Sequence, residues 1–346
     1  MKYSKIKFLT FFAIICSIGL APINDASAAE NTVIATVPVG TNPEGMAFDS
    51  ANNRMYVANQ DDDTVSVIDT SDYSILATIA LLATGGDSPG AIAFDSANDR
   101  MYVANSDTDA VSVIDTSDYS VIDANGGAAG SAIIVGDAPL DIAFDSTNDR
   151  MYVPNYFADT VSVINTATNA VDATIAVGDG PRDIAFDSAN NRMYVTNSLT
   201  TTVSVINTAT NAVDATISLT SSPQGIAFDS ANNRMYVANL VGDTVSVIDT
   251  SDNTVTATIT VGDGPLGVAF DSANNRMYVT NYSAGTVSVI DIAPTSSSSD
   301  CYDCIPPKLQ QIQINTPTDN YVLTGDDQLH ITANVGDTIS VNLQIT

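Results

Sequence analysis

Hydrophobic and polar residues follow one another along this chain in short blocks that return six times. In each return an apolar segment such as Ile-Ala-Phe leads into a polar turn of the form Asp-Ser-Ala-Asn-Asn, and then into Arg-Met-Tyr-Val and Val-Ser-Val-Ile. Short blocks rich in β-branched and aromatic residues, separated by Asp, Asn and Ser, predict strands joined by tight turns. The Arg-Met-Tyr-Val blocks lie 42 to 50 residues apart and begin at Arg54, Arg100, Arg150, Arg192, Arg234 and Arg276.

This period predicts four short strands per repeat, which is typical of propeller blades. The strand segments are apolar on both alternating faces, as expected for a sheet that is covered on both sides. We therefore predict an all-β, six-bladed β-propeller of four-stranded antiparallel blades. A strand of the outermost type occurs early, at 33–39, and none follows the third strand of the last repeat at 287–290. We expect the N-terminal strand to complete the last blade and close the ring.

The repeated segment ends in forms such as Tyr194-Val195-Thr196-Asn197 and Tyr278-Val279-Thr280-Asn281. In this it resembles the YVTN-repeat β-propeller family, over residues 32–291. That family is found on archaeal surface-layer proteins and on many exported bacterial and archaeal proteins. The resemblance implies a secreted or cell-surface module, and it leaves the function open because propellers serve as enzymes, binding proteins and scaffolds.

The segments outside the repeats indicate that the protein is exported. Residues 1–28 contain three lysines, an apolar run and Ala26-Ser27-Ala28, the pattern of a cleaved signal peptide, so we expect no membrane span after cleavage. The predicted propeller occupies 29–293, a Ser-rich linker 294–300, and a short β-rich segment 301–346. We predict a disulfide between Cys301 and Cys304, since an exported chain permits one.

The formal net charge of −29 excludes nucleic acid and anionic lipid surfaces as partners. We expect no cofactor. Calcium is a weaker alternative, because carboxylates gather in two predicted loops: Asp61, Asp62, Asp63, Asp107 and Asp109.

The inventory of reactive side chains argues against catalysis. The only histidine, His330, lies outside the repeats, and no lysine occurs between residues 29 and 300. Histidine-based and lysine-based mechanisms are therefore missing from the propeller, and we expect a protein that is not an enzyme. We expect it to act as a protein- or glycan-binding module or as a structural module of a surface layer. The alternative is a lactonase-like hydrolase. Lactonase-type propellers bind a divalent cation in the central channel, where Glu44, Asp141 and Asp183 could supply ligands.

Side chains differ between repeats at one rim only. The residues after each repeated proline, at the start of the innermost strand, vary, and so do the loops between the second and third strands. We expect these positions to line the mouth of the channel and to bind other cell-surface proteins or glycans. The candidates are Glu44, Asp141, Arg182, Asp183, Gln224, Tyr156, Phe157 and Tyr282. We expect the six repeated arginines at the opposite rim to contact neighbouring carboxylates.

Overall fold

The computed structural model describes residues 35–81, 87–122, 132–292, 312–315 and 320–323. Within them, regular structure is almost entirely β-strand, and the one helical turn is the 3-10 segment Gln60–Asp62. The all-β prediction is confirmed. The chain divides into two compact units, Met1–Asp291 and Ile292–Thr346. The predicted signal peptide, the linker and the Cys301–Cys304 pair lie outside the described residues.

The strands follow the repeats. The first strand of each repeat is β1 Pro43–Asp49, β5 Pro89–Asp95, β10 Ala143–Asp145, β14 Pro181–Asp187, β18 Pro223–Asp229 and β22 Pro265–Asp271. The second is β2 Arg54–Asn59, β6 Arg100–Asn105, β11 Arg150–Asn155, β15 Arg192–Asn197, β19 Arg234–Asn239 and β23 Arg276–Asn281. The third is β3 Thr64–Asp69, β7 Ala110–Asp115, β12 Thr160–Asn165, β16 Thr202–Asn207, β20 Thr244–Asp249 and β24 Thr286–Asp291. The outer strands are β4 Ile75–Ala80, β8 Val121–Ile122, β9 Ile133–Ile134, β13 Ala170–Ala176, β17 Ala212–Ser218 and β21 Thr254–Thr260.

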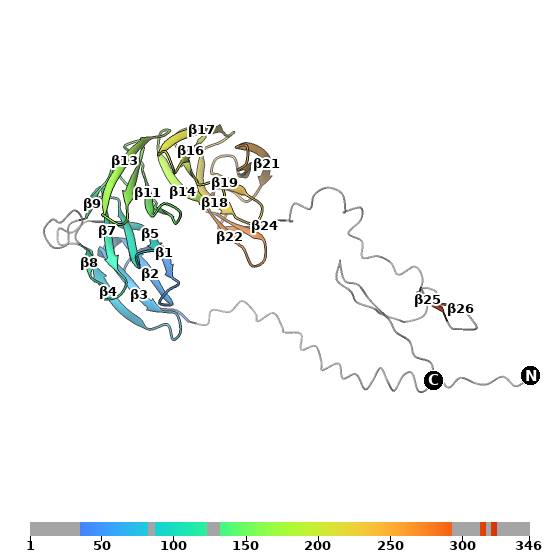
Figure 1. The fold of residues 1–346 in the computed structure, drawn as a ribbon, viewed down its shortest axis with the longest axis horizontal. Coiled ribbons are helices and arrows are strands. Elements are labelled where there is room, and N and C mark those ends of the chain that lie inside the picture. Colours follow the sequence, from blue (N-terminus) through green and yellow to red (C-terminus); the bar gives the residue numbers. More distant parts are fainter. Residues whose placement is uncertain (1–34, 82–86, 123–131, 293–311, 316–319, 324–346) are drawn as a thin grey trace, which may run out of the picture. The chain divides into compact units, whose positions relative to one another are not determined.

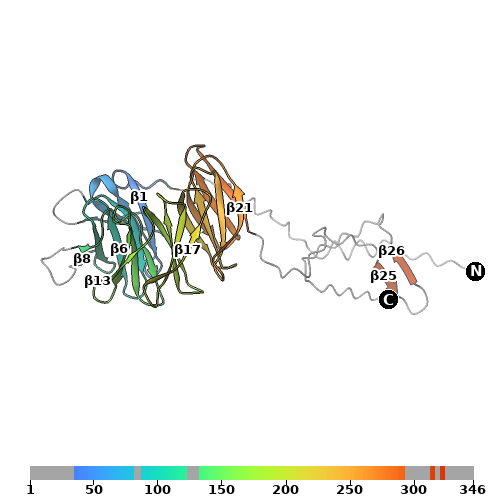
Figure 2. The same ribbon diagram turned by 90° about the horizontal axis from the view of Figure 1, so that it is seen from above.

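Each repeat forms its own antiparallel sheet, with the strands hydrogen-bonded in sequence order. Four of these sheets have four strands, the second has its outer strand split into β8 and β9, and the last has three strands, β22-β23-β24. In Figure 1 the sheets stand around a common centre, with β5, β14 and β18 on the inside and β13, β17 and β21 on the outside. Figure 2 shows the same strands running between two rims. In the second unit β25 Ile312–Asn315 pairs with β26 Asn320–Leu323.

The turn between the first two strands of each repeat is fixed by its first Asp. In the fourth repeat, Asp187 Oδ1 accepts the backbone N–H groups of Ala189 and Asn190 at 3.0 and 3.1 Å. The Asn190 side chain donates to Asp187 Oδ2 at 2.8 Å, and Asn191 takes a positive φ of 52°. These are the properties that favour Asp and Asn in turns, and they explain why the segment recurs almost unchanged.

Successive sheets pack face to face through large apolar side chains. Between the fourth and fifth repeats, one face contributes Tyr194, Val203 and Val205, and the other contributes Ile226, Met235, Val237 and Ile248, all buried. Equivalent clusters join the preceding sheets. Full burial of each such side chain contributes about 1.5–3 kcal/mol, so these interfaces hold the unit together.

The repeated arginines do not pair with carboxylates as expected. Arg54 and Arg100 donate from Nη1 to backbone carbonyls of the next repeat, Thr116 O at 2.8 Å and Thr166 O at 2.9 Å. Within the described residues the one ion pair joins Arg150 to Asp172, at 3.7 Å. The reason is geometric: the turn carboxylates already accept N–H groups of their own turn, as Asp187 does, while the arginines reach backbone carbonyls across the interface.

The predicted closure by the N-terminal strand is wrong for this structure. Residues 35–39 form no strand, and among the described residues the last sheet has only β22, β23 and β24. The Gly40 N–H instead donates to Asn59 Oδ1 at 3.0 Å, which holds this segment at the first sheet. In Figure 1, β24 and β1 belong to the two ends of the series of sheets, and their sheets are not paired with each other.

The two end faces of the series are consequently exposed. On the last sheet Val287 and Val289 are 55% and 54% exposed, whereas Val203 and Val205 at the same places in the fourth repeat are fully buried. On the first sheet Met46 is 66% exposed.

Candidate functional site

The variable positions at the start of the first strands lie on β-bulges. In β14, Pro181 is paired with Asn197 and Ile184 with Val195, so the register shifts across Arg182 and Asp183. The same shift occurs in β1 and β18, where it contains Glu44 and Gln224. A bulge re-aims side chains that a regular strand would point alternately to its two faces. Glu44, Arg182, Asp183 and Gln224 therefore share a distinct local backbone, whereas Asp141 lies just before β10.

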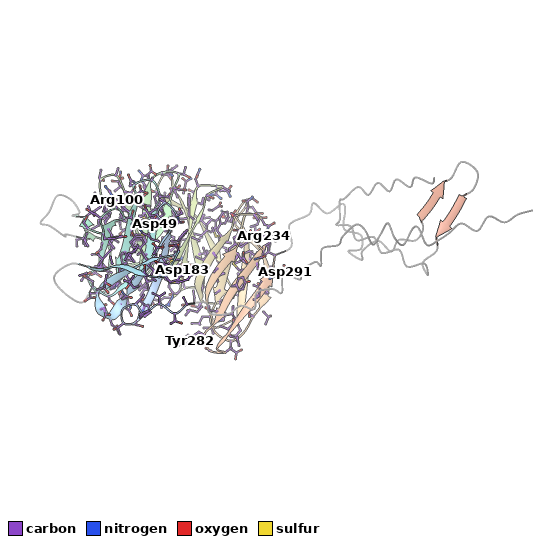
Figure 3. All side chains as sticks on the ribbon, turned by 90° about the horizontal axis from the view of Figure 1, so that it is seen from below. Asp49, Arg100, Asp183, Arg234, Tyr282 and Asp291 are labelled. Carbon is purple, nitrogen blue, oxygen red and sulfur yellow. The ribbon has the colours of Figure 1, made fainter. Side chains whose placement is uncertain are left out.

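Two of these side chains, Asp141 and Asp183, meet at one backbone N–H. Ile184 N lies 2.9 Å from Asp141 Oδ2 and 2.8 Å from Asp183 Oδ1, so both carboxyl groups accept from it. Asp183 Oδ2 accepts in turn from Ile226 N of the next sheet, at 3.0 Å. The pair thus spans three successive innermost strands. Figure 3 shows Asp183 within the body of the unit and not at its edge.

This arrangement perturbs the protonation of the pair. Burial raises the pKa of Asp141 well above its usual range, and the charge of Asp183 and a hydrogen bond with it raise the pKa further. Two carboxyl groups at one place cannot both ionise easily, so the pair retains a proton at pH values where isolated Asp residues are charged. Both residues are half-buried.

Thr196 positions the bulge that bears Asp183. Its Oγ1 accepts from Asp183 N at 3.1 Å and donates to Gln224 O at 2.7 Å, and its side chain is fully buried. Sequence reasoning missed this residue. The available signal was that the residue between Val and Asn in the repeated segment is Thr only at 196 and 280.

The other predicted channel residues do not join the pair. Glu44 is exposed, and its carboxylate lies beside Gly90 of the second repeat, 3.2 Å from the position of a Cβ there. Gln224 is buried and its Nε2 donates to Pro223 O at 3.0 Å. Arg182 is half-buried and makes no hydrogen bond or ion pair within the described part of the chain. Asp141 and Asp183 are the two that the fold brings together.

Some of the acidic residues considered as calcium ligands instead accept hydrogen bonds from backbone N–H groups of a neighbouring loop. Asp63 Oδ1 accepts from Ser88 N at 3.0 Å, and Asp109 Oδ1 accepts from Ala138 N at 2.9 Å. Asp159 and Asp243 make the same bond in later repeats. Asp62 Oδ2 accepts from Thr41 N at 2.6 Å, while Asp61 and Asp107 are exposed. Among the residues with described positions, no three His, Cys, Asp or Glu side chains form a group that could hold a metal ion.

The predicted rim residues are displayed on the loops. Phe157 and Tyr282 are 69% and 77% exposed. The Tyr156 ring lies edge-on against Phe157, with ring centroids 5.0 Å apart. No described helix has the length and apolar character needed to cross a membrane.

Comparison with known proteins gives one family match. A family model described as "Lactonase, 7-bladed beta-propeller" matches residues 141–298. The chain thus resembles a β-propeller family, and that family's stated blade number, seven, differs from the six repeats of this sequence. The match contradicts the expectation that the protein is not an enzyme, because the family is described by a hydrolytic activity. That expectation rested on missing His and Lys chemistry, which does not cover mechanisms based on carboxyl groups.

No curated protein matches the chain. Among solved structures, the hydrazine synthase of Kuenenia stuttgartiensis is similar at 17% identity, with a TM-score of 0.49, over 76% of this chain and 100% of that chain. A similarity of this size says nothing about function.

Proposed function

We propose that the protein is a lactonase-like hydrolase that opens a lactone or related cyclic ester at the Asp141–Asp183 pair. The observation that carries the proposal is the sharing of the Ile184 N–H by two carboxyl groups, of which Asp141 has a raised pKa. The match to a lactonase family begins at residue 141 and includes both carboxyl groups, which supports the same reading.

The chemistry needs one charged and one protonated carboxyl group. The Asp183 carboxylate accepts a proton from a water molecule as the water oxygen bonds to the carbonyl carbon of the ester. Asp141, in its protonated form, donates its proton to the ring oxygen as the carbon–oxygen bond breaks. The product is a hydroxy acid. General acid–base catalysis of this kind contributes about 10²- to 10⁴-fold in rate.

The divalent cation of the lactonase-like alternative is not needed for this step. Of the three carboxylates that could bind such a cation, Asp141 and Asp183 lie together, whereas Glu44 lies beside Gly90 in the first two repeats. We therefore assign the water-activating role to Asp183 and the proton-donating role to Asp141.

The test is hydrolysis of a panel of five- and six-membered lactones, followed by acid release at constant pH. We expect wild-type protein to hydrolyse at least one lactone above the buffer rate. Asp183→Asn and Asp141→Asn should each lower kcat/KM by about 100-fold or more. Asn keeps an acceptor for the backbone N–H groups, so the fold should survive. Asp179→Asn, an exposed carboxylate on the same rim, is the matched control and should retain wild-type activity.

No hydrolysis of any lactone by well-folded wild-type protein would overturn the proposal. So would wild-type rates in both Asn variants. The assay is repeated after dialysis against a chelator and with added calcium or magnesium, which separates the carboxyl-pair mechanism from one that depends on a bound cation.

We also propose that the hydrolase is exported and acts at or outside the cell surface. The support is the charged, apolar and small-residue pattern of residues 1–28. The mature protein, expressed from its full-length gene, should have an intact mass that corresponds to an N-terminus at Ala29. A mass that retains Met1 would contradict this.

A further inference from the structure

One rim of the propeller bears an arc of exposed apolar side chains. The loops that follow β11, β15, β19 and β23 carry one exposed large apolar residue each. We call these four the apolar arc: Phe157 at 69% exposure, Leu199 at 64%, Val241 at 77% and Tyr282 at 77%. Figure 3 shows Tyr282 at the tip of the last sheet, in the turn that follows β23. The position equivalent to Phe157, Leu199 and Val241 is an aspartate in the first two repeats: Asp61 in the first and Asp107 in the second.

The arc is held outward by specific contacts. The backbone N–H groups of Phe157 and Leu199 donate to Asp137 O and Asp179 O, both at 3.2 Å, and Tyr282 N donates to Gly264 O at 2.8 Å. The side chain of Leu199 lies over Gly180, where a Cβ would come within 2.6 Å of its Cγ. The loops are therefore firmly attached to the connections that enter the innermost strands, and the apolar side chains remain in water despite an ordered backbone.

Exposed carboxylates lie beside three of the four loops of the arc. Asp137 and Asp179, which accept the N–H groups of Phe157 and Leu199, are themselves exposed, and so is Asp263 in the last repeat. Between residues 35 and 292 the basic residues are the six repeated arginines, which begin strands at the opposite rim, and Arg182. The rim thus combines apolar side chains with negative charge, and Arg182 is its one cation among the described residues.

We propose that the apolar arc docks a protein segment in which apolar side chains are interspersed with Lys or Arg. Apolar contact with the arc and ion pairs with the flanking carboxylates would then form together, and interface cores are enriched in aromatic side chains of the kind that Phe157 and Tyr282 supply. A glycan fits less well: Leu199 and Val241 present no ring on which a sugar could stack, and the carboxylates are acceptors without donors. This docking is independent of the proposed hydrolysis.

The probe is a fluorescent peptide of alternating Leu and Lys, compared with a Ser and Lys peptide of equal charge and with a glucose hexasaccharide. We expect the Leu-Lys peptide to bind wild-type protein about 10-fold or more tightly than the Ser-Lys peptide, a difference of about 1.4 kcal/mol. Raising the salt concentration should weaken both peptides, because each makes ion pairs with exposed carboxylates.

Two matched variants locate the effect. Replacement of all four arc residues by Ser should abolish the preference for the Leu-Lys peptide. Replacement of Ile134, Val213 and Val255 by Ser, exposed apolar residues of the outer strands, should leave it intact. Equal Tm values of all three proteins would show that the fold is kept. The proposal is overturned by an unchanged preference in the arc variant, by an equal loss in the outer-strand variant, or by binding of the hexasaccharide in place of the peptide.

Discussion

Tyr102 on β6 donates its hydroxyl hydrogen to Asn169 Oδ1 of the next repeat, at 2.7 Å, across a fully buried part of the interface. The bond recurs from Tyr152 to Asn211 and from Tyr194 to Asn253. In the first interface the equivalent of Asn169 is Tyr119, and the buried hydroxyl of Tyr56 has no hydrogen-bond partner in the described residues. Identical tyrosines of the repeated segment therefore have different surroundings, because the residue facing them in the next repeat differs.

This difference predicts that the substitution of Tyr by Phe changes the free energy of unfolding by different amounts in the two repeats. Tyr102→Phe removes the short bond to Asn169 Oδ1, which keeps only the 3.5 Å bond from Arg100 Nη1, and should lower the free energy of unfolding by about 1–2 kcal/mol. Tyr56→Phe removes an unpartnered buried hydroxyl and should be neutral or slightly stabilising. Chemical denaturation of both variants checks this, and equal losses would contradict it.

The buried tyrosines also predict loss of stability at high pH. Burial raises the pKa of Tyr102 to about 12 and that of Tyr194 to about 12, against an unfolded value of 10.0. The folded state therefore holds these protons more tightly, so their contribution is complete below about pH 10 and is lost as pH rises toward 12. The Tm of the double variant Tyr102→Phe, Tyr194→Phe should fall less steeply than wild type across this window, although it starts lower. Parallel curves would argue against the mechanism.

The Asp141–Asp183 pair predicts a second pH dependence, at lower pH. The pKa of Asp141 is raised in the folded state, so its contribution to stability is complete below the unfolded pKa of about 4 and is lost as pH rises through the folded value. Asp141→Asn has no proton to lose. The Tm of this variant relative to wild type should increase as pH rises from about 4 toward neutrality. A constant difference across this range would show that the pair does not retain a proton.

Because the outer face of the last sheet is exposed, we predict that replacing Val by Ala lowers the free energy of unfolding by different amounts at two equivalent positions. Val203→Ala creates a cavity at a full interface and should cost about 2 kcal/mol. Val287→Ala removes methyl groups that are already in water, so its cost should stay below about 0.5 kcal/mol. Equal costs in denaturant titrations would mean that the last sheet is covered in solution.

The candidate site was partly predictable from the sequence. Asp141 and Asp183 follow repeated prolines in successive repeats, which predicted a common rim, and Glu44 occupied a comparable position in the first repeat. Sequence order could not show that the first two share the N–H of Ile184 while Glu44 lies beside Gly90. The role of Thr196 was equally hidden, because a hydroxyl that bridges two sheets is evident only once the distance between the sheets is known.

The sequence by itself determined the strands, their turns and the order of strands within each sheet. These depend on residues close together in the chain, such as Asp187 capping its own turn two and three residues later, so local chemistry is sufficient. Only the tertiary structure decided which carboxyl groups meet and whether the last sheet receives a fourth strand. Both depend on the rotation between neighbouring sheets, which the packed interface side chains set together and which no single repeat encodes.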